Sequence, residues 1–189
     1  DEDGIRVDLL PRTDVSAVYI TPSHQYPLGH ILSMERRKAL LAWSNQCGAY
    51  ILEDDYDSDF RFEDSPLPAL ASLDRTGAVI YLGTFSKVMG AGLRLGYMVL
   101  PPELVELATT VKSLFSFSHP WLVQAVMADF IETGEYAKRL RQMRHERMTR
   151  RDCLREALRH YFGDVTLAGL SGGMHVVWHL PADFPSSTA

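Results

Sequence analysis

The stretch YILEDDYDSDF, residues 50–60, passes from an apolar run directly into five acids, Glu53, Asp54, Asp55, Asp57 and Asp59. A short, continuous apolar run is typical of a strand that is buried on both faces of a parallel sheet. Parallel sheets hold their ligands at the carboxyl ends of their strands. So much negative charge at such an end calls for a cation nearby: a metal ion, a lysine or arginine, or the protonated ring of a cofactor.

The segments around this stretch predict a β-α-β unit. Short apolar runs recur at residues 17–21, 49–52, 79–82 and 97–100. A helical pattern from Ser33 to Gln46 separates the first two runs, with Ser33 as its N-cap and Gly48 as its stop signal. A strand, a helix and a second strand in this order favour parallel pairing, and the fold class is therefore α/β with a mostly parallel sheet.

The second half of the chain is mainly helical. Helical patterns run from 103 to 114, from His119-Pro120 to Gly134, and from 135 to 161, and strand-like runs follow at 165–167 and 174–180. We expect the C-terminal part of a large domain at 1–118, long interdomain helices at 119–162, and the start of a small α/β domain at 163–189. The chain opens on DEDGIRVDLL without a methionine and stops soon after a strand-like run, so we expect a fragment of a longer protein.

The composition is that of a globular protein, with 46% hydrophobic and 23% charged residues among 189. A net charge of −5 disfavours nucleic-acid binding by the chain as a whole. No apolar run approaches the roughly 20 residues that cross a bilayer, so we expect no membrane contact. Cys47 and Cys153 lie far apart without metal-ligand spacing, which indicates reduced thiols in a cytoplasmic protein.

Several single residues and one charged segment are interpreted structurally. Residues 138–159 hold nine Lys/Arg against three acids, and this basic segment is more typical of a solvated helix face than of a DNA contact. Trp43, Trp121 and Trp178 have apolar surroundings and are expected in the core. His145 and His175 lack partners at ligand spacing, so we expect no metal at either.

A metal does not explain the acids well. Asp55-x-Asp57-x-Asp59 has the opening spacing of a calcium loop, but Phe60 and Pro66 stand where that loop needs glycine and glutamate. A DDxxD magnesium motif fails at Ser58. A polar loop after a strand is enough to explain Asp57 and Asp59. It suits Asp54 less well, because Asp54 directly follows a buried strand.

The next strand-like run offers a partner in VIYLGTFSKVMGAGLRLGYMVL, residues 79–100. Lys87 follows a strand end, where a lysine near a carboxylate can serve as a Schiff-base lysine. The hydroxyls of Thr84 and Ser86, together with the donor fork of Arg94, would suit a phosphate. The segment lacks the Walker pattern GxxxxGK[ST], and GAGLRLG precedes a strand rather than a helix, so the glycines do not indicate a nucleotide loop. Taken alone, Lys87 would be a surface lysine.

Three motifs together carry a resemblance to a known family. EDDYDSDFRF, YLGTFSK…GLRLGYMVLP and TPSHQYPLG (21–29) resemble the pyridoxal phosphate enzymes of fold type I, the aspartate aminotransferase superfamily. They are most similar to the aminotransferase-like domain of MocR/GabR/PdxR-type transcription regulators of the GntR family. The resemblance covers nearly the whole chain, and it implies the three-layer, mostly parallel fold of pyridoxal phosphate-dependent transferases, present here in part.

The resemblance also implies roles for individual residues. Lys87 matches the Schiff-base lysine, Asp54 the partner of the pyridine nitrogen, and Tyr56 a contact of the cofactor's phenolic oxygen. Phosphate ligands would be Thr84, Ser86 and Arg94. The turn His24-Gln25-Tyr26 takes the place of the enzymes' Asn-Pro turn, so His24 and Tyr26 would also contact the cofactor. Leu28 departs from the family's usual Ser or Thr, with a small expected effect.

Two functions follow from this resemblance, and a third is weaker. The first is the effector-sensing domain of a bacterial regulator that binds pyridoxal 5'-phosphate, responds to that cofactor or a small amino compound, forms a homodimer and contacts DNA through a winged-helix domain outside this chain. The second is a class I/II aminotransferase that moves an amino group between an amino acid and a 2-oxo acid. TPSHQYP favours the regulator. The third is an assembly role alone.

The family's aromatic ring-stacking residue, further phosphate donors and substrate-carboxylate arginine would all lie outside this chain. The cofactor site is therefore expected to be incomplete here. We expect the isolated chain to bind the cofactor weakly and to carry out no transamination, whereas chemistry at Lys87 is possible in the full-length protein.

Overall fold

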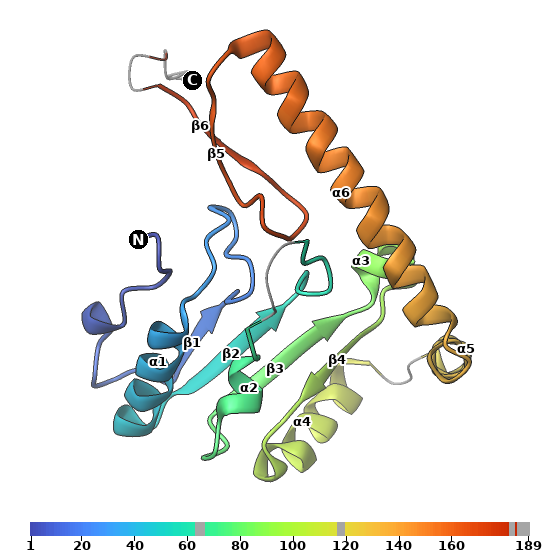
Figure 1. Ribbon diagram of the computed structural model, residues 1–189. Helices are drawn as coiled ribbons and strands as arrows, with labels where there is room; N and C mark the ends of the chain where they lie inside the picture. The colour runs from blue at the N-terminus through green and yellow to red at the C-terminus, as the bar shows by residue number, and fades with distance from the viewer. Residues whose placement is uncertain (63–66, 117–119, 182–183, 185–189) are drawn as a thin grey trace.

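The computed structural model describes residues 1–62, 67–116, 120–181 and 184, and it shows an α/β fold built on one four-stranded sheet (Figure 1). The strands are β1 (Ala17–Ile20), β2 (Tyr50–Asp55), β3 (Val79–Thr84) and β4 (Gly96–Val99), and they lie side by side in that order. β1, β2 and β3 pair in parallel, and β4 pairs antiparallel with β3. The predicted mostly parallel sheet is confirmed.

The helix α1 (Met34–Cys47) links β1 to β2, with ends that follow from local sequence. The Ser33 hydroxyl accepts a hydrogen bond from the backbone N–H of Arg36, as an N-cap does. Gly48 adopts a left-handed conformation at φ 69° and closes the helix by donating its N–H to the carbonyl of Ser44. The predicted range for this helix was right to within one residue at each end.

The core lies between α1 and one face of the sheet. Ile20, Ile51 and Val79, one from each parallel strand, pack with Leu40 and Trp43 of α1. The same cluster is completed by Leu32, Ala49 and Leu70, of which Leu70 begins the short helix α2 (Leu70–Leu73). Burial of these side chains at roughly 25 cal/mol per Å² is the main force that holds the parallel strands and α1 together.

One of the five acids has a structural role inside this core. The Glu53 carboxylate is fully buried and accepts hydrogen bonds of 2.8 Å from the backbone N–H groups of Leu70 and Ala71, so it caps the start of α2. The Arg37 guanidinium, also fully buried, lies 3.9 Å from Glu53 and donates to the carbonyls of Leu32 and Pro22. Glu53 is therefore a packing residue.

The remaining elements include the three predicted long helices and three short ones that were not predicted. A 3-10 turn, η1 (Val7–Leu9), precedes β1, and α3 (Ser86–Met89) and η2 (Ala91–Leu93) lie between β3 and β4. After β4 come α4 (Pro102–Phe115), α5 (Trp121–Glu132) and the long α6 (Glu135–Phe162), and then the antiparallel pair β5 (Thr166–Ala168) and β6 (Val177–His179). The prediction that His119 opens α5 lies outside the described residues.

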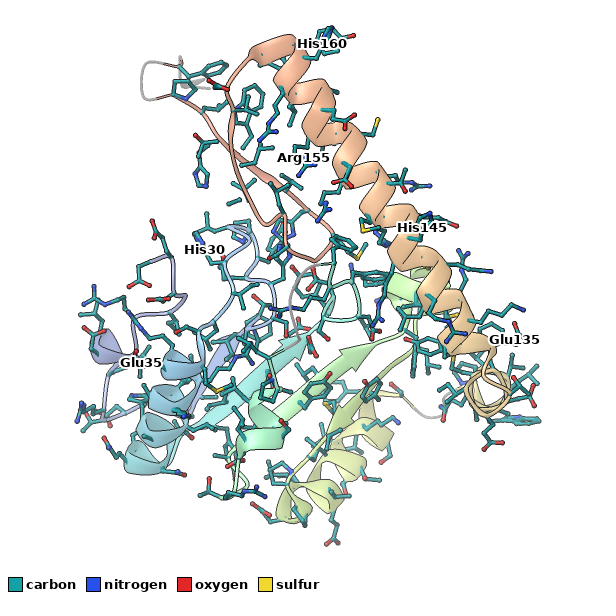
Figure 2. The ribbon with its side chains drawn as sticks, in the orientation of Figure 1. His30, Glu35, Glu135, His145, Arg155 and His160 are labelled. Carbon is teal, nitrogen blue, oxygen red and sulfur yellow. The ribbon has the colours of Figure 1, made fainter. Side chains whose placement is uncertain are left out.

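The helix α6 runs from α5, past α3, to the hairpin of β5 and β6 (Figure 1). Figure 2 shows Glu135 and His160 near its two ends. This arrangement agrees with the proposed division into a large domain (1–118), linking helices (119–162) and the start of a small domain (163–189), which stays a proposal. None of the helices in the described part of the chain combines the length and apolarity that crossing a membrane requires.

Two expectations about burial were wrong. Trp43 is in the core, but Trp121 at the start of α5 is 75% exposed, and Trp178 is half-buried against the ring of Phe162. All four residues of β4 are exposed, although its apolar sequence suggested a strand covered on both faces. The described residues leave about half of Tyr97, Met98 and Val99 uncovered, and most of Trp121.

We expect Glu53→Ala to destabilise the fold by at least about 3 kcal/mol, because it leaves two buried N–H groups without an acceptor and Arg37 without its carboxylate. Urea unfolding followed by circular dichroism measures this loss. Glu35→Ala, at an exposed position in the first turn of α1, is the control and should cost less than about 1 kcal/mol. Equal losses for the two variants would contradict the role given to Glu53.

Candidate functional site

A pocket of about 740 Å³ opens at the carboxyl ends of the parallel strands. Asp54 from β2, Tyr56 just after it and Lys87 from α3 all line this pocket. His30, on the loop between β1 and α1, lines it as well (Figure 2). Ligands of parallel α/β sheets bind at this edge, so the pocket stands where the sequence placed the site.

Asp54 is held in position by the neighbouring strand. β2 continues to Asp55, further than predicted, because Asp54 and Asp55 still pair with Leu82 and Gly83 of β3. The Tyr19 hydroxyl of β1 donates a hydrogen bond to the Asp54 carboxylate. That bond, helped by partial burial, raises the pKa of Tyr19 to about 12, so the phenol stays protonated as a donor. Asp54 is thus an anchored carboxylate at the wall of the pocket.

Tyr56 and Lys87 lie next to each other. The Lys87 Nζ atom is 5.8 Å from the centre of the Tyr56 ring. The Tyr56 hydroxyl donates to the backbone carbonyl of His24 at 3.0 Å, and burial, followed by the negative charge of Asp57, raises the pKa of Tyr56 above its usual value. Tyr56 and Lys87 also line a smaller pocket of about 50 Å³, together with Thr84. Lys87 therefore borders two pockets.

The structure brings some of the predicted residues together and leaves others apart. Tyr26 lines the large pocket, and Thr84 lines the small one while accepting a hydrogen bond from the N–H of Ser86 at 3.1 Å. In the described part of the chain, neither Ser86 nor Arg94 lines either pocket. Arg94 is exposed and adopts a left-handed backbone conformation at φ 51°. Of the three proposed phosphate ligands, Thr84 alone lines one of these two pockets.

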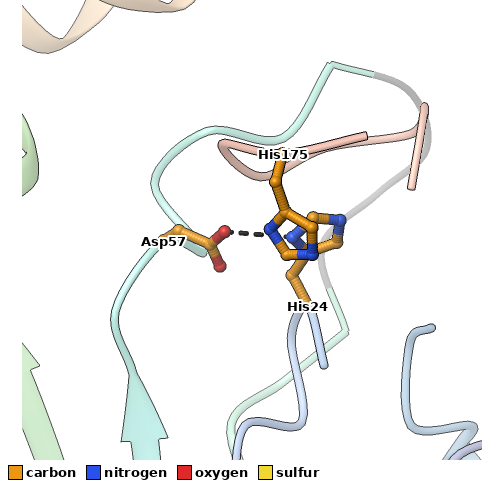
Figure 3. A group of neighbouring side chains, drawn as sticks. All are labelled: His24, Asp57 and His175. Atoms are coloured by element: carbon orange, nitrogen blue, oxygen red, sulfur yellow. Dashed lines mark hydrogen bonds and ion pairs between the residues drawn. The ribbon is translucent and has the colours of Figure 1, made fainter. Parts of the chain in front are cut away.

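His24 lies behind the pocket wall rather than in it. Its side chain is 2% exposed, and its Nδ1 atom is 3.1 Å from a carboxylate oxygen of Asp57 (Figure 3). The ring of His175, which does line the pocket, lies 4.3 Å from the His24 ring between centroids. The backbone carbonyl of His24 accepts a hydrogen bond from the Tyr56 hydroxyl and so connects His24 to the site. Sequence reasoning missed this group because its members come from distant segments without ligand spacing.

The acidic loop and the β5–β6 turn meet directly. The N–H of Gly173 donates to the carbonyl of Phe60 at 2.7 Å, and the N–H of Phe62 donates to the carbonyl of Ser171 at 3.0 Å. Gly173 is also required for space: a Cβ atom there would lie 2.0 Å from the His24 Nδ1 atom. The loop after β2, which carries the cofactor candidate Tyr56, is therefore joined to the start of the predicted small domain.

Basic residues of α6 hold the same region. The Arg147 guanidinium stacks over the Phe60 ring at 4.3 Å and donates to the Lys87 carbonyl at 3.3 Å. Arg144 donates to the carbonyl of Asp59. These contacts support the structural interpretation of the basic segment, since two of its arginines bind backbone carbonyls of this chain.

Comparison with known proteins agrees with this geometry. Residues 8–187 match the family described as aminotransferase class I and II. The chain belongs to the aminotransferase class I and II family. Among solved structures it resembles the multiple substrate aminotransferase of Thermococcus profundus, with a TM-score of 0.88 and 32% identity over 97% of this chain and 48% of the other. It also resembles the kynurenine aminotransferase of Pyrococcus horikoshii, with a TM-score of 0.83 and 31% identity over 90% of this chain and 42% of the other.

Curated relatives in this aminotransferase family include transcription regulators. The chain is 42% identical to the HTH-type transcriptional regulator YhdI of Bacillus subtilis, over 99% of this chain and 40% of the relative. It is 35% identical to the HTH-type pyridoxine biosynthesis transcriptional regulator PdxR of Corynebacterium glutamicum, over 94% of this chain and 38% of the relative. The chain thus spans about two fifths of the length of these relatives, and the resemblance found in the sequence is confirmed.

The fit around His24 can be tested with two glycines of similar conformation. Gly173→Ala combines a strained φ of 77° with a collision against a buried ring, so we expect a loss of about 2–5 kcal/mol in unfolding free energy. Gly134→Ala has a φ of 78° but nothing within 4 Å of the new methyl group, so it should lose only about 1–2 kcal/mol. If chemical denaturation gave equal losses, His24 would not be packed as described.

Proposed function

We propose that this chain is the cofactor-binding core of the aminotransferase-like domain of a bacterial transcription regulator. In the full protein that domain binds pyridoxal 5'-phosphate and senses the cofactor or a small amino compound, and it acts in the cytoplasm as a homodimer. DNA is contacted by a winged-helix domain outside this chain. The observation that carries the proposal is the meeting of Asp54, Tyr56 and Lys87 at one pocket, in a chain related to regulators over nearly its whole length.

The residues present fit the ring end of the cofactor. Pyridoxal phosphate, when bound, supplies a protonated pyridine ring that acts as an electron sink. The anchored carboxylate of Asp54 would hold the ring nitrogen by a charge-assisted hydrogen bond. Lys87 offers an amine for attachment to the cofactor's aldehyde carbon and for proton transfer, and Tyr56 would donate to the phenolic oxygen. Tyr26 would form part of the opposite wall.

The phosphate end is less complete in this chain. Thr84 adjoins Lys87, whereas Ser86 lies outside both described pockets and Arg94 is exposed. We keep Thr84, Ser86 and Arg94 as the proposed phosphate ligands, with further donors supplied by parts of the protein outside this chain. This agrees with the proposal that the isolated chain binds the cofactor weakly.

Exposed apolar side chains support the homodimer. On α4 and α5 they include Leu107, Leu114, Phe115, Trp121 and Leu122. Large exposed apolar patches usually mark a contact with another chain or domain, and these side chains lie on two consecutive helices.

The second candidate is a metabolic aminotransferase. It is favoured by the TM-score of 0.88 with an enzyme titled multiple substrate aminotransferase, and its local chemistry at Lys87 would be the same. The gene region upstream of Asp1 separates the two candidates. A winged-helix domain of about a hundred residues encoded there would support the regulator, and its absence would support the enzyme.

Two variants test the cofactor site in the full gene product. Lys87→Ala should abolish the visible absorbance of covalently attached cofactor, because no amine remains to form the bond. Asp54→Asn should weaken binding by about 1.5–3 kcal/mol, roughly 10- to 150-fold in Kd, because it removes the charge that holds the ring nitrogen. Asp14→Asn, at an exposed position, is the control. Unchanged spectra and affinity in both site variants would refute the assignment.

Sensing is tested by DNA binding. We expect the full gene product to bind the DNA upstream of its own gene, and a panel of amino compounds to change that affinity by at least about 5-fold. Fluorescence anisotropy measures both. Lys87→Ala should keep DNA binding and lose the response. Amino transfer to a 2-oxo acid without specific DNA binding would instead establish the enzyme.

A further inference from the structure

His24, Asp57 and His175 form a buried cluster from three separate segments. His24 comes from the loop after β1, Asp57 from the loop after β2, and His175 from the turn before β6 (Figure 3). One potential ligand atom from each side chain lies within 4.8 Å of the other two. His24 and Asp57 are each only 2% exposed. Buried polar groups are nearly always bonded, so this grouping of two imidazoles and a carboxylate indicates a specific role.

The cluster has unmet bonding capacity. Within the described residues, the His24 Nε2, Asp57 Oδ1 and His175 Nε2 atoms are buried without a hydrogen-bond partner. Buried polar atoms are nearly always satisfied by protein, water or an ion. Inside the cluster, His24 Nδ1 lies 3.1 Å from Asp57 Oδ2, and the two imidazole rings lie 4.3 Å apart between centroids. Each side chain therefore has an atom available for a further ligand.

Charge points to a cation. A carboxylate as buried as that of Asp57 requires a compensating positive charge. Arg147 lies close enough to interact with Asp57 electrostatically, but its guanidinium lies over the Phe60 ring and donates to the Lys87 carbonyl instead. A divalent ion would balance the carboxylate and bind the two imidazoles at once.

We propose that His24, Asp57 and His175 bind a divalent transition-metal ion, for which Zn²⁺ is the best match. Two imidazoles and one carboxylate are a ligand set that zinc accepts, and a water would fill the fourth position. Ligand atoms about 2.0–2.1 Å from a tetrahedral ion lie about 3.3 Å apart. Binding would therefore draw the three segments closer together than the 4.8 Å limit that the cluster now meets.

The position of the site gives the metal a mechanical consequence. His175 lines the large pocket, and the backbone carbonyl of His24 holds the Tyr56 hydroxyl. A bound ion would join the turn before β6 to the loops after β1 and β2. It would thereby fix the wall of the pocket to the predicted small domain, whether or not the pocket holds pyridoxal phosphate.

The test measures Zn²⁺ binding to the untagged, chelator-treated full gene product by isothermal titration calorimetry. We expect Asp57→Asn and His175→Ala each to weaken one binding event per chain by at least about 100-fold, since even changes behind the ligands cost 10–100-fold. His145→Ala, at an exposed histidine of α6, is the matched control and should bind like the wild type.

A second measurement guards against misfolding. Circular dichroism of the metal-free variants must match the wild type, and the visible spectrum of bound Co²⁺ in the wild type should be lost in His175→Ala, the less buried of the two positions. The proposal is overturned if the wild type binds no Zn²⁺, or if both folded variants retain its affinity. The three side chains would then form a hydrogen-bonded group alone.

Discussion

Parallel pairing of β1, β2 and β3 is the constraint on which the site depends. The register pairs Tyr19 with Leu52 and Asp54 with Leu82, so the Tyr19 hydroxyl reaches the carboxylate two residues beyond its partner. The same register ends β3 beside β2, and the chain then enters α3, which carries Lys87. A slip of one residue would exchange the two faces of β2, turning Glu53 toward the pocket and Asp54 into the core.

Strand alternation explains why five neighbouring acids do not act as one charge cluster. Glu53 points to the core and caps α2, whereas Asp54 points to the pocket and binds Tyr19. Asp55 returns to the face of Glu53, where it accepts from the Tyr81 hydroxyl at 2.7 Å. Asp57, past the strand, meets His24. Each of these four carboxylates has its own partner, so the stretch does not act as one charge cluster, and the acids differ in role because they differ in direction.

How well the sequence predicted each feature depends on how far apart in the chain the residues that determine it lie. The N-cap Ser33, the stop at Gly48 and the apolar runs act within a few residues, and they predicted α1 and the sheet well. The helix α3 escaped notice because four residues are too few to show a period. Burial of Trp121 was mispredicted because burial depends on tertiary contacts, which apolar neighbours in the sequence do not specify. The contact of His24 with His175 depends on the whole fold and leaves no local pattern.

Arginines of the long helix α6 connect the loop after β2 and the helix α3 to the turn after β5. Arg147 contacts Phe60 and the carbonyl of Lys87, while Arg151 stacks over Phe62 and donates to the carbonyl of Leu170 beside β5. A guanidinium can hold a ring and a carbonyl together because it is planar and carries several donors. Displacement of the hairpin would therefore pull on the acidic loop and on the helix of Lys87 through the same row of arginines. The basic segment 138–159 therefore connects the start of the predicted small domain to the pocket. Neither a solvated helix face nor a DNA contact would explain the carbonyl bonds of Arg147 and Arg151.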